Sequence, residues 1–224
     1  MGSFLLVILL VVNFGISWWN AYAAGKAWYP SLAEGGWIRL VVWSVAIMSA
    51  LGFTYVFMFI GGAGAVAWDI SAHSGPGQHL WFTEEMINGY ASLAYILVWP
   101  GIVGSGLVMT IHSWKVARAE GGARNYMVAG YNTFAQAWNV IDGIRFLPDA
   151  FGKVGGLFKG DSKNKGSLVL LMILLVSLVA GILLTRMILL SSARATMQRW
   201  GYYNVGEAYG GGSRKAPDRY AEGY

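Results

Sequence analysis

The chain has no cysteine among its 224 residues, so disulfide bonds, thiolate metal sites and catalytic thiols are excluded within it. Charged residues are also scarce, at 12%, where an ordinary soluble domain has about a quarter. Instead, 56% of the residues are hydrophobic and 15% are aromatic, including 11 tryptophans. Such an aromatic excess is typical of side chains at the two surfaces of a bilayer. The composition predicts an all-α integral membrane protein.

The hydrophobic residues gather in four stretches, at positions 4–19, 40–67, 90–111 and 168–190. About 20 apolar residues cross the hydrocarbon core of a bilayer, so we predict four transmembrane helices. The first stretch is followed by Ala21-Tyr22-Ala23, which resembles a signal-peptidase site. No Lys or Arg precedes Phe4, however, so the basic start of a signal peptide is missing. We therefore expect an uncleaved first membrane helix.

We expect the chain to be organised in four parts. Residues 1–112 form the first three membrane helices with a 68–86 loop between the second and third, and residues 113–166 form a polar segment. Residues 167–192 form the fourth membrane helix, and residues 193–224 form a tail rich in Gly and Tyr. A terminal segment of that composition, without an apolar period, is expected to be poorly ordered.

The distribution of basic residues predicts the orientation in the membrane. Residues 113–166 are rich in Lys and Arg, whereas residues 68–86 contain neither. The positive-inside rule then places residues 113–166 in the cytoplasm and residues 68–86 outside, in a cell (inner) membrane. With four spans both ends of the chain face outward. This leaves the basic tail on the outer side, against the rule.

Large apolar residues recur within the 113–166 segment at alternating spacings of four and three. They are Met127, Tyr131, Phe134, Trp138 and Ile141. This spacing places them on one face of a helix, with Asn132, Gln136 and Asn139 on other faces, and Pro148 is predicted to end the pattern. We therefore expect an amphipathic cytoplasmic helix between the third and fourth membrane helices. Its apolar face is expected to lie against the membrane surface or a partner subunit, because such a stripe in water favours aggregation.

Small residues four positions apart occur in two of the predicted membrane helices. They are Gly61 with Ala65, and Gly101 with Ser105. Small residues at this spacing let membrane helices approach closely. The sequence GIVGSG at 101–106 also resembles a phosphate-binding loop, but it lacks the preceding strand and the lysine that such loops need. We expect these residues to serve helix packing, including self-association.

Most of the acids and histidines that suggest chemistry lie in one stretch, WDISAHSGPGQHLWFTEEM at 68–86. Asp69, His73, His79 and Glu84 have the oxygen and nitrogen ligands of a zinc-type site, and Asp69 and His73 share one helical turn. The alternative is a solvated turn, in which Thr83 caps the third membrane helix and Glu84 complements its dipole. The loose spacing favours the turn, so no cofactor is expected.

These patterns predict a non-enzymatic, multi-pass membrane protein that self-associates or serves as a structural or pore-forming subunit of a membrane assembly. The alternative is a metal-binding membrane enzyme, or a subunit of one, that uses Asp69, His73 and His79. The expected partners are the lipid bilayer and a second copy or a larger membrane complex. Nucleic acid is not expected, because the basic residues form no block interleaved with exposed aromatics.

Overall fold

The computed structural model describes residues 2–77, 79–158 and 165–199, and the regular structure in these ranges is helical. The elements are α1 (Gly2–Glu34), α2 (Gly36–His73), α3 (Glu84–Glu120), α4 (Ala123–Val154), the short 3-10 helix η1 (Gly155–Phe158) and α5 (Lys165–Arg199). Four of them, α1, α2, α3 and α5, are long and apolar enough to cross a membrane. The all-α class and the four predicted apolar helices are thus confirmed.

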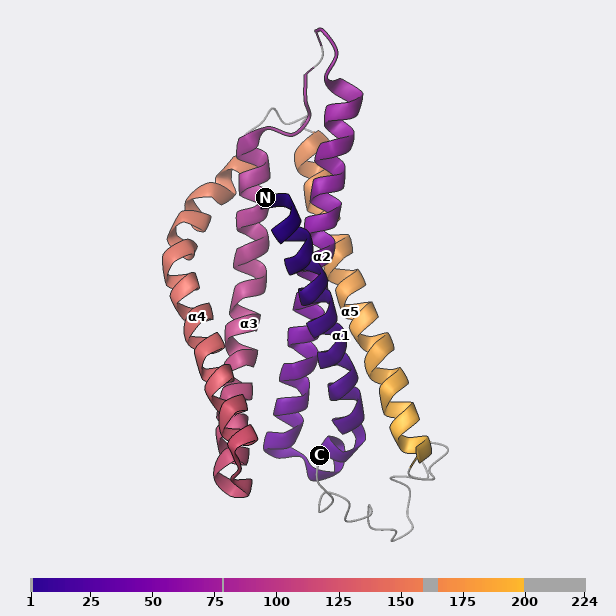
Figure 1. Ribbon diagram of the computed structural model, residues 1–224. Coiled ribbons are helices and arrows are strands. Elements are labelled where there is room, and N and C mark those ends of the chain that lie inside the picture. Colours follow the sequence, from indigo (N-terminus) through magenta and orange to yellow (C-terminus); the bar gives the residue numbers. More distant parts are fainter. Residues whose placement is uncertain (1, 78, 159–164, 200–224) are drawn as a thin grey trace.

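The helices are arranged as a three-helix bundle with a two-helix extension. α1, α2 and α5 pack against one another, α3 packs against α2, and α4 packs mainly along α3 (Figure 1). Glycines form the tight turns between antiparallel neighbours. Gly35 has a φ of 65° between α1 and α2, and Gly121 and Gly122 have φ of 69° and 83° between α3 and α4. Only glycine adopts such positive φ values at no steric cost.

α5 begins at the end of the molecule where α3 begins, not where α3 stops. Ser167, in the first turn of α5, donates its hydroxyl to the carbonyl of Leu157 at 2.5 Å. Leu157 itself lies against Gly89 in the first turns of α3. A chain of four alternating spans would instead start α5 where α3 stops. The chain returns along α4, which at about 1.5 Å per residue is roughly 48 Å long.

α4 is longer than the apolar pattern predicts. It continues through Pro148 to Val154, so the prediction that Pro148 ends the helix is wrong. Proline removes one backbone hydrogen bond and crowds the preceding turn, which bends a helix without necessarily ending it. In Figure 1, α4 bows away from α3 and then returns to it. Leu157 of η1, which is fully buried, anchors the chain after that bend.

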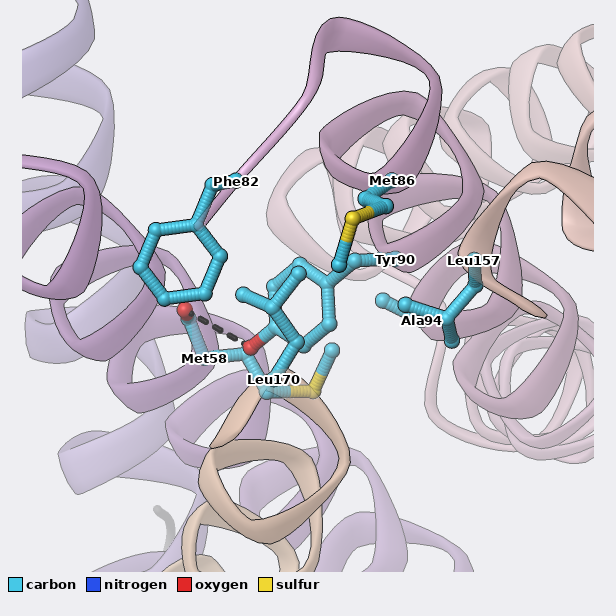
Figure 2. Packing of buried hydrophobic residues seen from close by; sticks show 7 residues of the cluster. All are labelled: Met58, Phe82, Met86, Tyr90, Ala94, Leu157 and Leu170. Atoms are coloured by element: carbon cyan, nitrogen blue, oxygen red, sulfur yellow. Dashed lines mark hydrogen bonds between the residues drawn. The ribbon is translucent and has the colours of Figure 1, made fainter. Parts of the chain in front are cut away.

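The main hydrophobic cluster joins four elements at the end where α3 begins (Figure 2). Its buried members are Met58, Phe82, Met86, Tyr90, Ala94, Leu157 and Leu170. Tyr90 of α3 is placed by a hydrogen bond from its hydroxyl to the carbonyl of Met58 of α2, at 3.0 Å. Gly62 of α2 leaves room for the Tyr90 ring. This cluster fixes the level of α3, η1 and α5 against α2.

Candidate functional site: the Asp69 cluster and the α3–α4 interface

Asp69 lies near the end of α2 and is 1% exposed. One carboxylate oxygen, Oδ2, accepts hydrogen bonds from the backbone N–H groups of Trp81 at 2.8 Å and Phe82 at 3.0 Å. The other oxygen, Oδ1, lies 2.8 Å from Nδ1 of His73. The carboxylate therefore holds residues 81–82, just before α3, against the end of α2. A buried carboxylate is tolerated when it is hydrogen-bonded in this way.

His73 completes the cluster by stacking on the Trp81 ring and meeting the Trp68 ring edge to face. Its imidazole lies 4.9 Å from the Trp81 ring and 5.4 Å from the Trp68 ring, centroid to centroid. The two indoles also contact each other at 5.2 Å. The Asp69 cluster, which we define as Trp68, Asp69, His73, Trp81 and Phe82, is thus a hydrogen-bonded aromatic junction.

The structure brings together only two of the four candidate metal ligands. Asp69 and His73 are in contact, whereas His79 and Glu84 are exposed and take no part in the cluster. Within the described residues, no group of three or more His, Asp or Glu side chains could hold a metal ion. Thr83 does cap α3, since its hydroxyl accepts from the N–H of Met86 at 3.3 Å. The partners that sequence reasoning missed are the N–H groups of residues 81 and 82, because backbone donors carry no sequence signature.

A series of polar contacts joins residues 95–114 of α3 to residues 132–142 of α4. Toward one end, the Tyr95 hydroxyl donates to Asp142 at 3.2 Å and Trp99 Nε1 donates to the Asn139 carbonyl at 2.8 Å. Toward the other end, Trp114 Nε1 donates to Thr133 Oγ1 at 2.9 Å. Between them, Gln136 Nε2 donates to the Val103 carbonyl at 2.9 Å and Thr110 Oγ1 to the Asn132 carbonyl at 3.2 Å. From residue 95 to residue 114 these contacts cover about 28 Å of α3.

Two glycines shape this α3–α4 interface. Gly143 of α4 faces the indole of Trp99, and Gly106 of α3 faces the side-chain amide of Gln136. A β-carbon at either glycine would overlap the opposing side chain. Gln136 is 9% exposed, and its Oε1 is buried without a hydrogen-bond partner. The side chains of Trp99 and Gln136 therefore fill the spaces that the two glycines leave on the opposite helix. These glycines could be recognised from the sequence only if the pairing of the two helices were already known.

The predicted apolar stripe of α4 lies on the side of the helix away from α3. Met127, Tyr131 and Phe134 are each 68% exposed, Trp138 is 59% exposed and Ile141 is 46% exposed. Ile144 and Phe151 continue the stripe. The rings of Phe134 and Trp138 stack with centroids 6.4 Å apart. We call this surface the outer face of α4. Residues 127–141 are therefore helical and these large apolar side chains are exposed, while the polar face packs on α3 instead of facing water.

The four small residues that were predicted to serve helix packing lie close to neighbouring elements of the same chain or are buried in it. A β-carbon on Gly61 would meet Ile173 of α5, and one on Gly101 would meet Leu51 of α2. Ala65 packs against the main hydrophobic cluster, and Ser105 is 5% exposed. Self-association through these four residues is not tested by a single chain, but Gly61 and Gly101 already contact neighbouring helices.

Other close contacts in the three-helix bundle were not predicted. Gly25 lies against α5, while Gly52 and Gly181 lie against Ser17 and Thr54, respectively. At the level of Gly52, Ser49 donates its hydroxyl to the Ser17 carbonyl at 2.8 Å. The same hydroxyl lies 3.1 Å from Thr185 Oγ1 of α5. This buried hydrogen-bonded junction links all three helices, as expected for polar groups between membrane helices.

At the other end of the molecule, α2 and α3 are joined through His112. Trp37 Nε1 donates to His112 Nδ1 at 3.4 Å, and the Lys115 ammonium lies 3.9 Å from the centroid of a Trp37 ring. An ammonium over an indole face is a favourable cation–π contact. A recess of about 210 Å³ beside His112 is lined by residues of α2, α3 and α4. These contacts tie the start of α2 to the end of α3.

Comparisons of the chain with protein families, with curated proteins and with solved structures gave no match. The class of protein is therefore defined by the fold, an all-helical chain with four helices long and apolar enough to cross a membrane.

Proposed function

We propose that the protein is a non-enzymatic, multi-pass membrane protein that self-associates and serves as a structural subunit of a membrane assembly. The contact between copies, in this proposal, is the outer face of α4. The observation that carries it is the asymmetry of α4. One side of the helix is locked on α3 by hydrogen bonds, while the opposite side presents large apolar residues without a described partner.

The composition of the outer face supports a protein partner. Aromatic residues and methionine are enriched at the centres of protein–protein interfaces. Phe134 and Trp138 form a stacked pair in the middle of the face, and paired aromatic anchors of this kind contribute much of the energy of such interfaces. Gly61 and Gly101, by contrast, already contact residues of the same chain. The outer face of α4 therefore replaces the small-residue positions as the proposed contact.

A cysteine cross-linking experiment tests this proposal. Because the chain has no native cysteine, any disulfide between copies must come from the introduced residue. In a two-fold symmetric dimer, residues near the axis face their own copies. Trp138→Cys and Phe134→Cys should therefore form disulfide-linked dimers when membranes are treated with a mild oxidant. Ile16→Cys, which is 52% exposed on α1, is the matched control and should not.

The mass of the protein in a mild detergent provides the second measurement. The wild type should be oligomeric, and the mass distinguishes a dimer from a ring of copies that encloses a pore. Trp138→Ala should weaken association by at least about tenfold, the effect of losing a central anchor. Trp19→Ala, at 65% exposure on α1, should leave it unchanged. A monomeric wild type that forms no cross-links at either α4 position contradicts the proposal.

A further inference from the structure

We infer that α4 is a fifth membrane crossing, whose outer face lies at the depth of the hydrocarbon core. This inference does not rest on the proposed function, because it holds for a single copy as well as for an oligomer. It replaces the expectation that residues 113–166 lie entirely on the cytoplasmic side.

The first support is the level of α4 relative to α3. The polar contacts span about 28 Å of α3, from Tyr95 to Trp114, and about 15 Å of α4, from residue 132 to residue 142. The Gly121–Gly122 turn and the contact of Leu157 with Gly89 place the two ends of α4 beside α3. The hydrocarbon core of a bilayer is about 30 Å thick. α3 is itself apolar enough to cross a membrane, so a helix held beside it over this length occupies the same depth.

The second support is the direction of the chain. α4 starts beside the end of α3 and is followed by η1, whose Leu157 packs against Gly89 near the start of α3. α5 then begins at that same end, where Ser167 bonds to Leu157. If α3 and α5 both cross the bilayer in the same direction, the chain between them must cross it once in the other.

The third support is the pattern of polarity in α4. The seventeen residues 125–141 contain no Asp, Glu, Lys or Arg and are about 25 Å long as a helix. The mean hydropathy of α4 is lowered by polar residues such as Thr133 and Gln136, and these bond to α3. Polar groups inside a bilayer need such internal partners. The polar face therefore points to α3, and the apolar outer face points away from it, at the depth of the hydrocarbon core.

The basic residues agree with an odd number of crossings. Toward the end of the molecule where α3 stops lie Lys26, Arg39, Lys115, Arg118, Arg124, Arg194 and Arg199. The other end holds, among the described residues, Lys153 and Lys165. Arg145 lies between the two ends, two residues beyond Gly143, which faces Trp99 in the middle of α3. With five crossings, the end of α5 falls on the basic side, which the positive-inside rule makes cytoplasmic. The conflict that four spans create for the C-terminal basic residues disappears.

Single cysteines at the two ends of α4 test the crossing. Ala123→Cys and Gly152→Cys are exposed positions near its start and end, and Ala119→Cys and Ser74→Cys are references on the neighbouring turns. A membrane-impermeant maleimide should label positions 74 and 152 on intact cells. It should label positions 119 and 123 only after permeabilisation. Labelling of 123 and 152 from the same side overturns the crossing, and a fully reversed pattern overturns the orientation.

Spin labels along the outer face provide a second, independent readout. Cysteines at Met127, Phe134, Trp138 and Ile144 would each carry a nitroxide in protein reconstituted into vesicles. The ratio of collisions with oxygen to collisions with a polar nickel complex rises with depth. A crossing helix should give higher values at 134, 138 and 144 than at 127, because Ile144 follows Gly143, which faces Trp99 in the middle of α3. A uniform, shallow depth at all four positions is the result for a helix lying on the membrane surface, and it would overturn the inference.

Discussion

Gly143 of α4 lies directly against the indole of Trp99 of α3, in a space that leaves no room for a β-carbon. At the same place the indole N–H donates to the carbonyl of Asn139, one turn earlier on α4, at 2.8 Å. A slip of one turn in the other direction would put Leu147 under the ring instead of glycine. The pair therefore fixes the register of the α3–α4 interface.

Gly143→Ala should destabilise the protein by about 1–3 kcal/mol, the usual cost of an overpacked contact. The added methyl group displaces Trp99 and weakens its bond to Asn139. Gly130→Ala is the matched control, because Gly130 is on the same helix with no neighbour within 4 Å of a β-carbon. Thermal unfolding in detergent, followed by circular dichroism, measures both. Equal midpoints of thermal unfolding for the two variants would show that the Trp99 ring does not need the space left by the missing β-carbon of Gly143.

Gly101→Leu should destabilise the fold of a single chain, because a side chain there meets Leu51 of α2. Gly104→Leu, three residues further along α3, enters open space and should leave the midpoint of unfolding nearly unchanged. The unfolding curves should be compared at protein concentrations tenfold apart. An effect of Gly101→Leu that vanishes at high concentration would instead point to a contact between copies, as the sequence pattern suggested.

The sequence predicted which segments are helical better than it predicted which helices pack against one another. Length and apolarity identified the four helices that are apolar enough to cross a membrane, because these properties are local. The stripe from Met127 to Ile141 was also recognised as helical. The partner of its polar face was not, since an apolar stripe with a polar opposite face has the same pattern whether the polar face meets water or another helix. The difference lies in the partner. Trp99 and Val103 of α3 satisfy the polar face of α4.

The 68–86 stretch shows the same limit for a candidate site. The spacing of Asp69 and His73 correctly placed them on one helical turn, and Thr83 was correctly predicted to cap α3. The two alternatives considered, a metal site and a solvated turn, did not include the arrangement that the structure shows for Asp69, however. Asp69 is neither exposed nor gathered with other acids, because two backbone N–H groups from residues twelve and thirteen positions later bind it.

Ser49→Ala should reduce stability by about 1 kcal/mol, the typical value of a hydrogen bond between membrane helices. The change removes the donor to the Ser17 carbonyl and the partner of Thr185. Combining it with Thr185→Val gives a double-mutant cycle, in which the coupling energy should be clearly different from zero. Ser71→Ala is the control, because the exposed Ser71 hydroxyl bonds only within its own helix, to Trp68. Strictly additive effects would show that Ser49 and Thr185 do not interact.

Asp69→Ala should destabilise the protein by about 2–4 kcal/mol, because it leaves the N–H groups of Trp81 and Phe82 without their acceptor. Asp69→Asn keeps one acceptor oxygen and should cost less. His79→Ala removes an exposed side chain and should change stability by less than about 0.5 kcal/mol. Unfolding in detergent ranks the three variants, and hydrogen exchange should become faster at the Phe82 amide in Asp69→Ala.

The same variants decide between the structural junction and the metal site. If Asp69 acts by holding residues 81–82, purified wild-type protein should contain no stoichiometric metal by elemental analysis. The ranking of the Asp69 variants should then be unchanged by a chelator. His73→Ala should be mildly destabilising through the loss of its contacts with Asp69 and Trp81. One tightly bound transition metal per chain, lost from both Asp69→Ala and His79→Ala, would instead show that His79 folds back onto the cluster as a ligand.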